Sequence, residues 1–304
     1  MNIADIDIKG EIRRKEPLSS HTSFEIGGSA DMLAYPADRE DLKTLLQAIK
    51  DRNLSHFILG CGTNLLVRDG GFRGVVISLK QMNAVTIERE YRSIGGSFAV
   101  LYAEAGTPVP KLLAVAVEEG LTGLEFAAGI PGSVGGAVLM NAGTTLGEFG
   151  DIISSVTLIS PDGVLVTMAS DEFRFGYRTA SVPEGHCVVD VRMILRHDDK
   201  EKVRARILGL LTKRKERQPQ GSPNAGSIFK NPNEESAARL IESAGLKGRT
   251  VGGAQVSDKH ANFIINLGKA KASDVLALMD VVKQTVLEVH GVRLEPEIKI
   301  IGED

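Results

Sequence analysis

The stretch from Ala225 to Pro232, A-G-S-I-F-K-N-P, combines residue types that could hold an anion and move a proton. The hydroxyl of Ser227 follows a glycine, and the ammonium of Lys230 and the amide of Asn231 follow an apolar pair. A hydroxyl beside a cation can bind a negatively charged substrate and deliver one proton to it. The same octapeptide is also typical of a tight turn between two core segments, so its interpretation depends on the rest of the chain.

Two glycine-rich loops could enclose a phosphate group, because backbone N–H groups approach an anion closely only where no Cβ blocks the way. Neither loop has the G-x-G-x-x-G pattern of a Rossmann fold or the pattern of a P-loop, and a sheet connection with positive φ would explain one such loop equally well. Two of them in one domain favour a cofactor with a pyrophosphate. The predicted cofactor-binding residues are Gly60, Cys61, Gly62, Thr63, Asn64 and Leu65 in the first loop, and Gly129, Ile130, Pro131, Gly132, Ser133, Gly135, Gly136, Asn141, Ala142 and Gly143 in the second.

The segments around these loops alternate between strand and helix patterns. Apolar spacing behind Asp38 predicts a helix over 38–53, and Gly120 ends a second helix over 109–119. Strands are predicted at 56–59, 75–79, 100–105, 155–160, 164–168, 187–195, 262–266 and 297–302, and further helices within 198–220 and at 234–244. A long helix after Ser273 ends at Gly291, and its predicted apolar face comprises Val275, Leu278, Met279, Val282, Val286 and Val289.

The composition, 42% hydrophobic and 25% charged, is that of an ordinary soluble globular protein. A net charge of −3 argues against a nucleic-acid-binding protein, and no apolar run is long enough to cross a bilayer. The N-terminus lacks the pattern of a secretory signal. The 2 cysteines form no C-x-x-C pair, which excludes a disulfide scaffold and a zinc cluster. We therefore expect a cytoplasmic protein without a metal site.

The chain is long enough for two domains with separate cores. After His197 the sequence becomes highly charged, which marks a boundary. We expect a first domain over residues 1–200, composed of two subdomains that divide near residue 80, and a second domain over residues 201–304.

Several motifs together resemble UDP-N-acetylenolpyruvoylglucosamine reductase, the bacterial flavoenzyme family that completes UDP-N-acetylmuramate for peptidoglycan. They are H-T-S-F-E-I-G-G-S-A at 21–30, G-C-G-T-N-L-L-V-R-D at 60–69, G-I-P-G-S-V-G-G-A-V-L-M-N-A-G at 129–143, F-G-Y-R at 175–178, A-G-S-I-F-K-N-P at 225–232 and L-E-P-E-I-K-I-I-G at 294–302. The resemblance runs from about residue 18 to the C-terminus, in the order of the family. The short interval between Arg178 and Ser227 places the chain with the shorter type of the family, which lacks a tyrosine-bearing flap.

The resemblance implies an α+β fold. Its first part is an FAD-binding domain of the vanillyl-alcohol-oxidase/p-cresol-methylhydroxylase type with two α/β subdomains, and its second part is a C-terminal α+β domain that binds the UDP-sugar. Both glycine loops would then surround the FAD pyrophosphate. Relatives in that superfamily that tether flavin covalently use a histidine in the first loop, where this chain has Thr63 and Asn64, so we expect non-covalent FAD. Cys61 could react with flavin, but a small buried cysteine is the stronger expectation.

The reaction that the resemblance implies is the NADPH-dependent reduction of the enolpyruvyl group of UDP-N-acetylglucosamine enolpyruvate. Ser227 matches the family's proton donor, Arg178 its catalytic arginine, which clamps a carboxylate, and Glu297 its catalytic glutamate. By themselves, Arg178 could be a surface residue and Glu297 a solvated strand residue. The substrate-binding candidates are Tyr177, Arg217, Lys230, Asn231 and His260, with Asn262 as a weaker one.

Two other functions explain part of the sequence. An FAD-dependent oxidase or dehydrogenase of the same superfamily would explain the glycine loops but not the serine motif or the E-P-E motif. A regulator that only binds flavin or a nucleotide sugar would need no proton donor. The expected partners are therefore the enolpyruvyl substrate and NADPH, with no nucleic acid and no membrane, and we expect a monomer.

Overall fold

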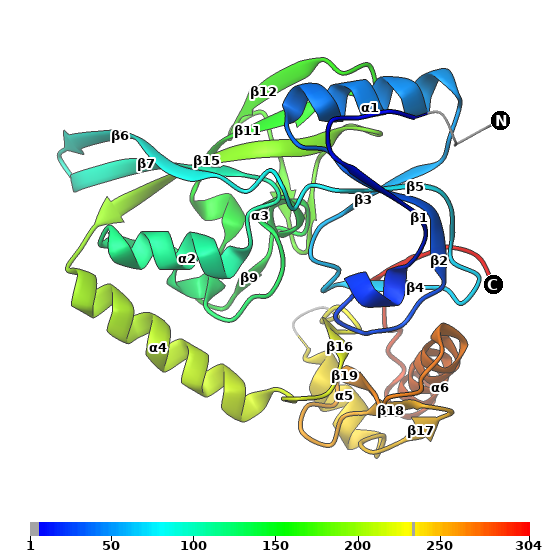
Figure 1. Cartoon of the computed structure of the whole chain (residues 1–304). Coiled ribbons are helices and arrows are strands. Elements are labelled where there is room, and N and C mark those ends of the chain that lie inside the picture. Colours follow the sequence, from blue (N-terminus) through cyan, green and yellow to red (C-terminus); the bar gives the residue numbers. More distant parts are fainter. Residues whose placement is uncertain (1–5, 233–234) are drawn as a thin grey trace. The chain divides into compact units, whose positions relative to one another are not determined.

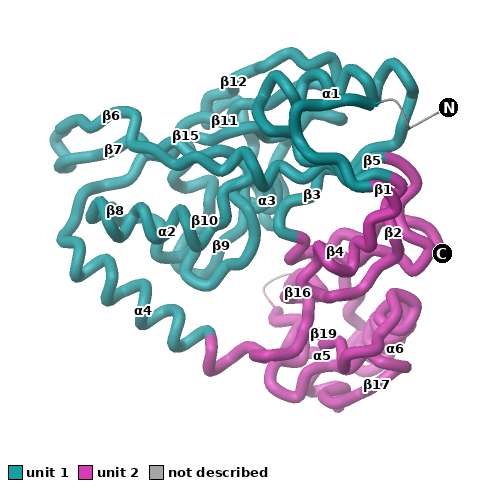
Figure 2. The backbone as a smooth tube through the Cα atoms, viewed as in Figure 1, with its two compact units in different colours: residues 1–13, 32–61, 75–214 teal, residues 14–31, 62–74, 215–304 magenta. Residues whose placement is uncertain are grey.

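A computed structural model describes residues 6–232 and 235–304, and the chain forms two compact units (Figures 1 and 2). Unit 1 contains residues 1–13, 32–61 and 75–214, and unit 2 contains residues 14–31, 62–74 and 215–304. Unit 2 thus takes two segments from the N-terminal part of the chain. Residue 200, the expected domain boundary, is the first residue of helix α4 (Lys200–Arg217), and the chain passes into unit 2 within the last turn of this helix.

Two sheets contain most of the strands in the first two thirds of the chain. The order of the first is β1-β2-β5-β3, with β1 (Glu11–Pro17), β2 (Ser29–Tyr35), β5 (Phe72–Ser78) and β3 (His56–Leu59). The second is antiparallel and has the order β12-β11-β15-β7-β6, with β12 (Leu165–Ala169), β11 (Ile153–Ile159), β15 (Cys187–His197), β7 (Gly96–Glu104) and β6 (Val85–Ser93). Residue 80 lies between the last strand of the first sheet and the first strand of the second.

Helices α1 (Arg39–Asp51) and α2 (Val109–Glu118) form where the apolar spacing predicts them. The carboxylate of Asp38 accepts a hydrogen bond from the Asp41 amide and so caps α1. The apolar face of α1 is buried in the core of unit 1, beside residues of β2, β5, β7, β11 and β15. Gly120, with φ of 62°, takes the left-handed conformation after the end of α2.

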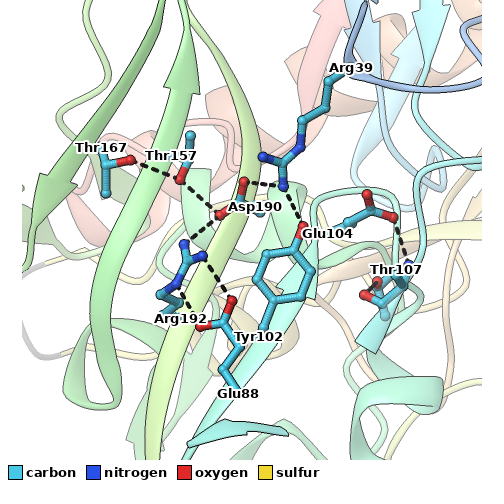
Figure 3. A network of polar contacts seen from close by, with 10 residues as sticks. Arg39, Glu88, Tyr102, Glu104, Thr107, Thr157, Thr167, Asp190 and Arg192 are labelled. Atoms are coloured by element: carbon cyan, nitrogen blue, oxygen red, sulfur yellow. Dashed lines mark hydrogen bonds and ion pairs between the residues drawn. The ribbon is translucent and has the colours of Figure 1, made fainter. Parts of the chain in front are cut away.

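A buried network of polar contacts attaches the start of α1 to the second sheet (Figure 3). The side chain of Asp190 on β15 is 1% exposed, and its carboxylate lies 2.8 Å from Nη2 of Arg39 and 3.0 Å from Nη1 of Arg192. It also accepts a hydrogen bond of 2.8 Å from the hydroxyl of Thr157 on β11. A buried carboxylate is tolerated only when it is paired, and the contact with Arg39 joins the start of α1 to β15.

Unit 2 has its own antiparallel sheet with the order β16-β19-β18-β17, formed by β16 (Asn224–Ser227), β19 (Phe263–Asn266), β18 (Ala254–Val256) and β17 (Thr250–Val251). Helices α5 (Ala237–Ser243) and α6 (Ala272–His290) pack in its core, and β4 (Leu65–Val67) pairs in parallel with β20 (Lys299–Ile301). Residue 234 of the predicted helix at 234–244 lies outside the described residues.

The predicted apolar face of α6 is correct except at its end. Val275, Val282 and Val286 are buried with Leu278 and Met279, but Val289 is 56% exposed, because the last turn of the helix extends past the core. The sequence patterns also missed β1, β2 and β6. The remaining short elements are 3₁₀ turns at Leu18–His21, Glu125–Ala127 and Phe149–Asp151, helix α3 (Val134–Leu139), and strands β8 (Leu121–Thr122), β9 (Gly143–Thr144), β10 (Gly147–Glu148), β13 (Phe175–Gly176) and β14 (Thr179–Ala180).

Within residues 6–232 and 235–304, no helix has both the length and the apolar character needed to span a membrane. The same part of the chain contains no group of three or more His, Cys, Asp and Glu side chains arranged to hold a metal ion.

Candidate functional site

The two glycine loops meet in unit 1 beside a cavity of about 80 Å³. Gly60 follows β3, and a Cβ at this position would lie 2.6 Å from the hydroxyl oxygen of Ser133, so the loops approach this closely only because residue 60 is glycine. Apolar side chains form much of the wall. The lining residues are Ile58, Leu59, Gly60, Cys61, Leu79, Lys80, Ala105, Gly106, Ser133, Gly135, Gly136, Leu139, His186, Cys187 and Val188. A mostly apolar lining with a few polar groups is the usual form of a small-molecule site.

Several groups of the second loop are already used within the protein. Ser133 is the N-cap of α3 and accepts a 3.4 Å hydrogen bond from the Gly136 amide. The amide of Gly135 donates to the carbonyl of Ala105 at 2.8 Å, and a Cβ on Gly135 would lie 2.8 Å from the Cβ of Ala105. Gly135 is therefore required for close packing against Ala105, directly after β7. Of the loop's other predicted residues, Ile130 is buried and Pro131 is exposed, and Gly132 accepts from the Val109 amide.

Asn141 supports the hairpin that carries Arg178. It is fully buried, its Nδ2 donates to the carbonyl of Gly176 at 3.1 Å, and its Oδ1 accepts from the Gly150 amide at 2.9 Å. This hairpin consists of β13 and β14, and Tyr177 and Arg178 form its turn. The amide of Asn141, predicted to contact the cofactor, is thus directed at main-chain groups of the protein. Ala142 and Gly143 follow it and are half-buried.

Two arginines come together at the second glycine loop. Arg178 has φ of 56°, its guanidinium lies 5.3 Å from the ring centre of the exposed Tyr177, and its Nη1 donates to the carbonyl of Gly143 at 3.2 Å. Arg214, in the last turn of α4, is half-buried, and its Cδ lies 2.7 Å from the point where Gly129 would carry a Cβ. Burial, and after it the charge of Arg178, lower the pKa of Arg214. Two half-buried positive charges that repel each other in this way favour a bound anion.

Arg217, and not Arg214, is the arginine of α4 that the sequence predicts to contact the substrate. Arg217 is exposed at the end of α4, one helical turn beyond Arg214. Residues three positions apart lie on neighbouring parts of a helix surface, so their spacing in the sequence does not separate the two arginines. Most of the charged segment after His197 is a solvated helix face: Val203 and Ile207 are the buried residues of α4.

In unit 2 the rest of the first glycine loop is held by the segment 21–24. Gly62 has φ of 64°, and a Cβ there would lie 2.1 Å from the carbonyl oxygen of His21. The amide of Ser23 donates to the Gly62 carbonyl at 3.1 Å, and the Ser23 hydroxyl donates to the Asn224 carbonyl at 2.6 Å. The H-T-S-F motif therefore links the first loop to the strand that leads to Ser227. Thr63 is half-buried, and Leu65 is buried at the start of β4.

Ser227 and Glu297, two of the three predicted catalytic residues, lie in segments that are hydrogen-bonded to each other. The amide of Glu297 donates to the carbonyl of Ile228 at 2.8 Å, and the Lys230 amide donates to the carbonyl of Glu295 at 2.9 Å. Gly226, directly before Ser227, has φ of 75°, a conformation that favours glycine. Nothing lies within 4 Å of the position that a Cβ would occupy there. Ser227 and Glu297 are both half-buried, so each side chain is accessible to a small molecule.

The predicted substrate-binding residues Lys230, Asn231 and His260 of unit 2 have different surroundings. The ammonium of Lys230 is 3.8 Å from the exposed carboxylate of Glu295, a weak surface pair. Asn231 accepts a hydrogen bond of 3.0 Å from the Ala237 amide at the start of α5. His260 is half-buried, burial lowers its pKa, and its ring centre lies 4.7 Å from that of Phe263. No hydrogen-bond partner for its Nδ1 is found among the described residues.

Two corrections concern Asn262 and Cys61. Asn262, expected to line the sugar site, is 4% exposed, and its amide is bonded to the main chain of Phe229. Cys61, expected to be buried, is exposed at the cavity, although partial burial of its thiol raises its pKa. Cys187 is the buried cysteine, and burial raises its pKa to about 12.

Comparisons with known proteins agree with these two parts of the site. Residues 30–169 match the family model described as "FAD binding domain", and residues 218–301 match that described as "UDP-N-acetylenolpyruvoylglucosamine reductase, C-terminal domain". The reductase of this name from Moorella thermoacetica is 46% identical over 97% of this chain and 95% of its own length. That from Clostridium novyi is 43% identical over 97% of this chain and 94% of its own length.

A solved structure of a reductase of the same name is also similar to this chain. The crystal structure of UDP-N-acetylenolpyruvylglucosamine reductase from Thermus caldophilus superposes with a TM-score of 0.80 at 36% identity, covering 97% of this chain and 99% of its own. The predicted α+β fold class, with an FAD-binding domain and a C-terminal domain of this family, is confirmed. The chain belongs to the UDP-N-acetylenolpyruvoylglucosamine reductase family of FAD-dependent oxidoreductases.

Proposed function

We propose that this protein reduces the enolpyruvyl group of UDP-N-acetylglucosamine enolpyruvate to give UDP-N-acetylmuramate, a precursor of peptidoglycan, with NADPH as the source of the hydride. The observation that carries the proposal is the pairing of the Ser227 and Glu297 segments through the Glu297 amide and the Ile228 carbonyl. It brings the main-chain segments that carry Ser227 and Glu297 together in a chain of this family. A protein that only binds a nucleotide sugar needs no such pair.

The residues of unit 1 fit FAD. The glycine edge at Gly60 leaves room that a Cβ would fill, the cavity wall is largely apolar, and Arg214 places positive charge beside Gly129. We propose that residues 1–200 hold FAD through the two glycine loops, with Arg214 near the pyrophosphate. Bound FAD would supply hydride transfer from NADPH to the substrate. Since Thr63 and Asn64 stand where covalent relatives carry histidine, the FAD is held non-covalently.

The reaction adds a hydride to the terminal methylene carbon and a proton to the adjacent carbon, so negative charge builds on that carbon and its carboxylate. Arg178 binds the carboxylate through its guanidinium, which matches two oxygens at once. Ser227 gives its hydroxyl proton to the adjacent carbon, and Glu297 lies near the same carbon. Residues 201–304 bind the UDP-sugar. The residues proposed for substrate binding are Tyr177, Arg217, Lys230, Asn231 and His260.

The test separates the two halves of the reaction. The purified protein should be yellow, and acid should release the chromophore. After reduction by NADPH, mixing with the enolpyruvyl nucleotide should reoxidise the flavin quickly, and mixing with oxygen slowly. Ser227→Ala should keep the reduction by NADPH and lose reoxidation by substrate by about 10²–10⁴-fold, the usual contribution of a positioned acid. Ser222→Ala, a half-buried serine on the same segment, is the control and should behave as wild type.

Two results would reject the proposal. Faster reoxidation by oxygen than by the nucleotide would indicate an FAD-dependent oxidase instead. Normal reoxidation by the nucleotide in Ser227→Ala would remove Ser227 from proton delivery.

A further inference from the structure

The dipeptide Ile228–Phe229, directly after Ser227, has all of its main-chain polar groups engaged, and Asn262 engages three of them. The amide of Ile228 donates to the main-chain carbonyl of Asn262 at 2.9 Å. The amide of Phe229 donates to Oδ1 of Asn262 at 3.0 Å, and Nδ2 of Asn262 donates to the carbonyl of Phe229 at 2.8 Å. The remaining group, the carbonyl of Ile228, accepts from the amide of Glu297 at 2.8 Å.

These contacts lie in the core of unit 2. Ile228 is 0% exposed, Phe229 is 1% exposed and Asn262 is 4% exposed. An unpaired main-chain group in such surroundings is strongly unfavourable, so the dipeptide has little freedom while Asn262 is present. An asparagine side chain carries a donor and an acceptor on one planar group. It can therefore form hydrogen bonds with both the N–H and the C=O of the same residue. Ser227 and Lys230, on either side, extend from this fixed dipeptide.

We propose that Asn262 is a positioning residue that sets where the Ser227 hydroxyl lies relative to Glu297. The proposal rests on the role proposed above for Ser227. Asn262 touches neither reacting atom; it acts through the main chain of residues 228 and 229. Proton delivery should therefore depend on Asn262, whereas flavin reduction by NADPH should not. A displacement of about 1 Å at a reacting group can reduce a rate by about 10²-fold, so the effect is measurable.

The chain offers a matched control in Asn266. It lies at the other end of β19, is 5% exposed, and uses its amide in the same manner. Its Nδ2 donates to the Phe24 carbonyl at 3.0 Å, and its Oδ1 accepts from the amides of Gly268 at 2.7 Å and Ala270 at 3.0 Å. Asn266→Ala thus removes a comparable set of buried hydrogen bonds from the same unit without touching residues 228 and 229.

The experiment compares Asn262→Ala and Asn266→Ala in the flavin-loaded enzyme, with Asn262→Asp as a variant that keeps the side-chain volume but cannot donate to Phe229 at neutral pH. Stopped-flow absorbance measures flavin reduction by NADPH and flavin reoxidation by the enolpyruvyl nucleotide separately. We expect both Asn262 variants to slow reoxidation by about 10–100-fold with reduction unchanged within about twofold. Their solvent deuterium isotope effect on reoxidation should rise. Hydrogen exchange of the Phe229 amide should become faster in Asn262→Ala, because Asn262→Asp keeps an oxygen that accepts from this amide. Asn266→Ala should show none of these changes.

A double variant shows whether Asn262 acts through Ser227. In the Ser227→Ala background, Asn262→Ala should produce no further slowing of reoxidation. Equal slowing in Asn262→Ala and Asn266→Ala, or a full additional loss in the double variant, would overturn the positioning role while leaving Ser227 as proton donor. Normal reoxidation in Ser227→Ala alone would overturn the proton donor itself, and with it the positioning role.

Discussion

The side-chain amide of Asn64 donates to the main-chain carbonyl of Glu297 across 3.1 Å. The main-chain carbonyl of Asn64 also accepts from the Lys299 amide at 3.0 Å, so one residue of the first glycine loop holds the chain on both sides of residue 298. Because the Glu297 amide in turn donates to Ile228, an unbroken set of hydrogen bonds joins this loop to the segment after Ser227. Asn64, predicted as a cofactor contact, therefore also supports the segment that carries Glu297, just before β20.

Arg214 should contribute to FAD binding although it is absent from the predicted site. Arg214→Gln removes the positive charge beside Gly129 and keeps much of the side chain's length. Hydrogen bonds to charged groups contribute about 1.5–3 kcal/mol, so the affinity for FAD should fall by about 10–100-fold. Titration of the apoprotein with FAD, followed by flavin fluorescence, measures the change. Lys213→Gln, at the exposed neighbouring position, should bind FAD as wild type does, and equal losses in both variants would contradict the assignment.

The two cysteines should differ in reactivity. Cys61 is exposed and lines the cavity, whereas Cys187 is buried with its pKa raised to about 12. The thiolate is the reactive form, so iodoacetamide at pH 8 should label Cys61 in the apoprotein and leave Cys187 unlabelled until the chain unfolds. Bound FAD should slow the labelling of Cys61. Peptide mass spectrometry identifies the labelled site, and rapid labelling of Cys187 in the folded protein would contradict its burial.

Asp69 should stabilise α6 in a pH-dependent manner. Its carboxylate accepts from the amides of Ala272 at 2.8 Å and Ser273 at 3.0 Å, at the start of the helix. Burial opposes ionisation, but the bonds from Ser273 and Ala272 outweigh it and lower the pKa of Asp69. A lowered pKa means that the folded state favours the carboxylate, so the stabilisation is complete above the unfolded-state value of about 3.9 and disappears as the pH falls through the folded-state value.

Asp69→Asn tests this stabilisation. The free energy of unfolding at pH 7 should fall by about 1 kcal/mol, the usual contribution of a capping carboxylate, and the difference from wild type should shrink below about pH 4. Urea unfolding across pH 3–7 measures it. Asp280→Asn, at an exposed position on α6, is the control, and its free energy of unfolding should be close to that of wild type. A difference that stays constant down to pH 3 would show that the charge of Asp69 is not responsible.

Two glycines with similar backbone conformations should respond differently to the same substitution. Gly62 has φ of 64° and Gly226 has φ of 75°. At Gly226 nothing lies within 4 Å of the added Cβ, so alanine should destabilise unit 2 by about 1 kcal/mol through backbone strain alone. At Gly62 the Cβ would lie 2.1 Å from the His21 carbonyl oxygen, so the loop must move. We expect the free energy of unfolding to fall by more than about 3 kcal/mol, and FAD binding to weaken. Similar unfolding midpoints in urea for the two variants would contradict this difference.

The sequence predicted those elements whose signals are local. Helix α1 has both a cap, Asp38, and a regular apolar face, and Gly120 and Gly291 mark the ends of α2 and α6. Strand β6, V-T-I-E-R-E-Y-R-S, was missed although Val85, Ile87 and Tyr91 alternate with polar residues, because Arg89 interrupts the alternation and none of its residues is fully buried. Its pairing with β7 depends on tertiary structure.

The chemistry of the site was harder to predict than its location. The octapeptide and the glycine loops were found from residue type and spacing, but the direction of an amide cannot be read from either. Asn141 and Asn262 have the residue type of ligand contacts, yet both are buried and bonded to main-chain groups of the protein. Arg214 and Arg217 are one helical turn apart, and only the packing of α4 distinguishes the half-buried one from the exposed one.

Unit 2 is assembled from residues 14–31, 62–74 and 215–304, and this has a consequence for biosynthesis. The first two segments leave the ribosome before about 140 further residues are made, which takes roughly 7–28 s at 5–20 residues per second. During that interval Phe24, Ile26 and Leu66, which are buried in the finished core of unit 2, have no permanent neighbours. Nascent chains stalled before residue 215 should therefore depend on a holding chaperone, and that dependence should end when the last strand, β20, has been released.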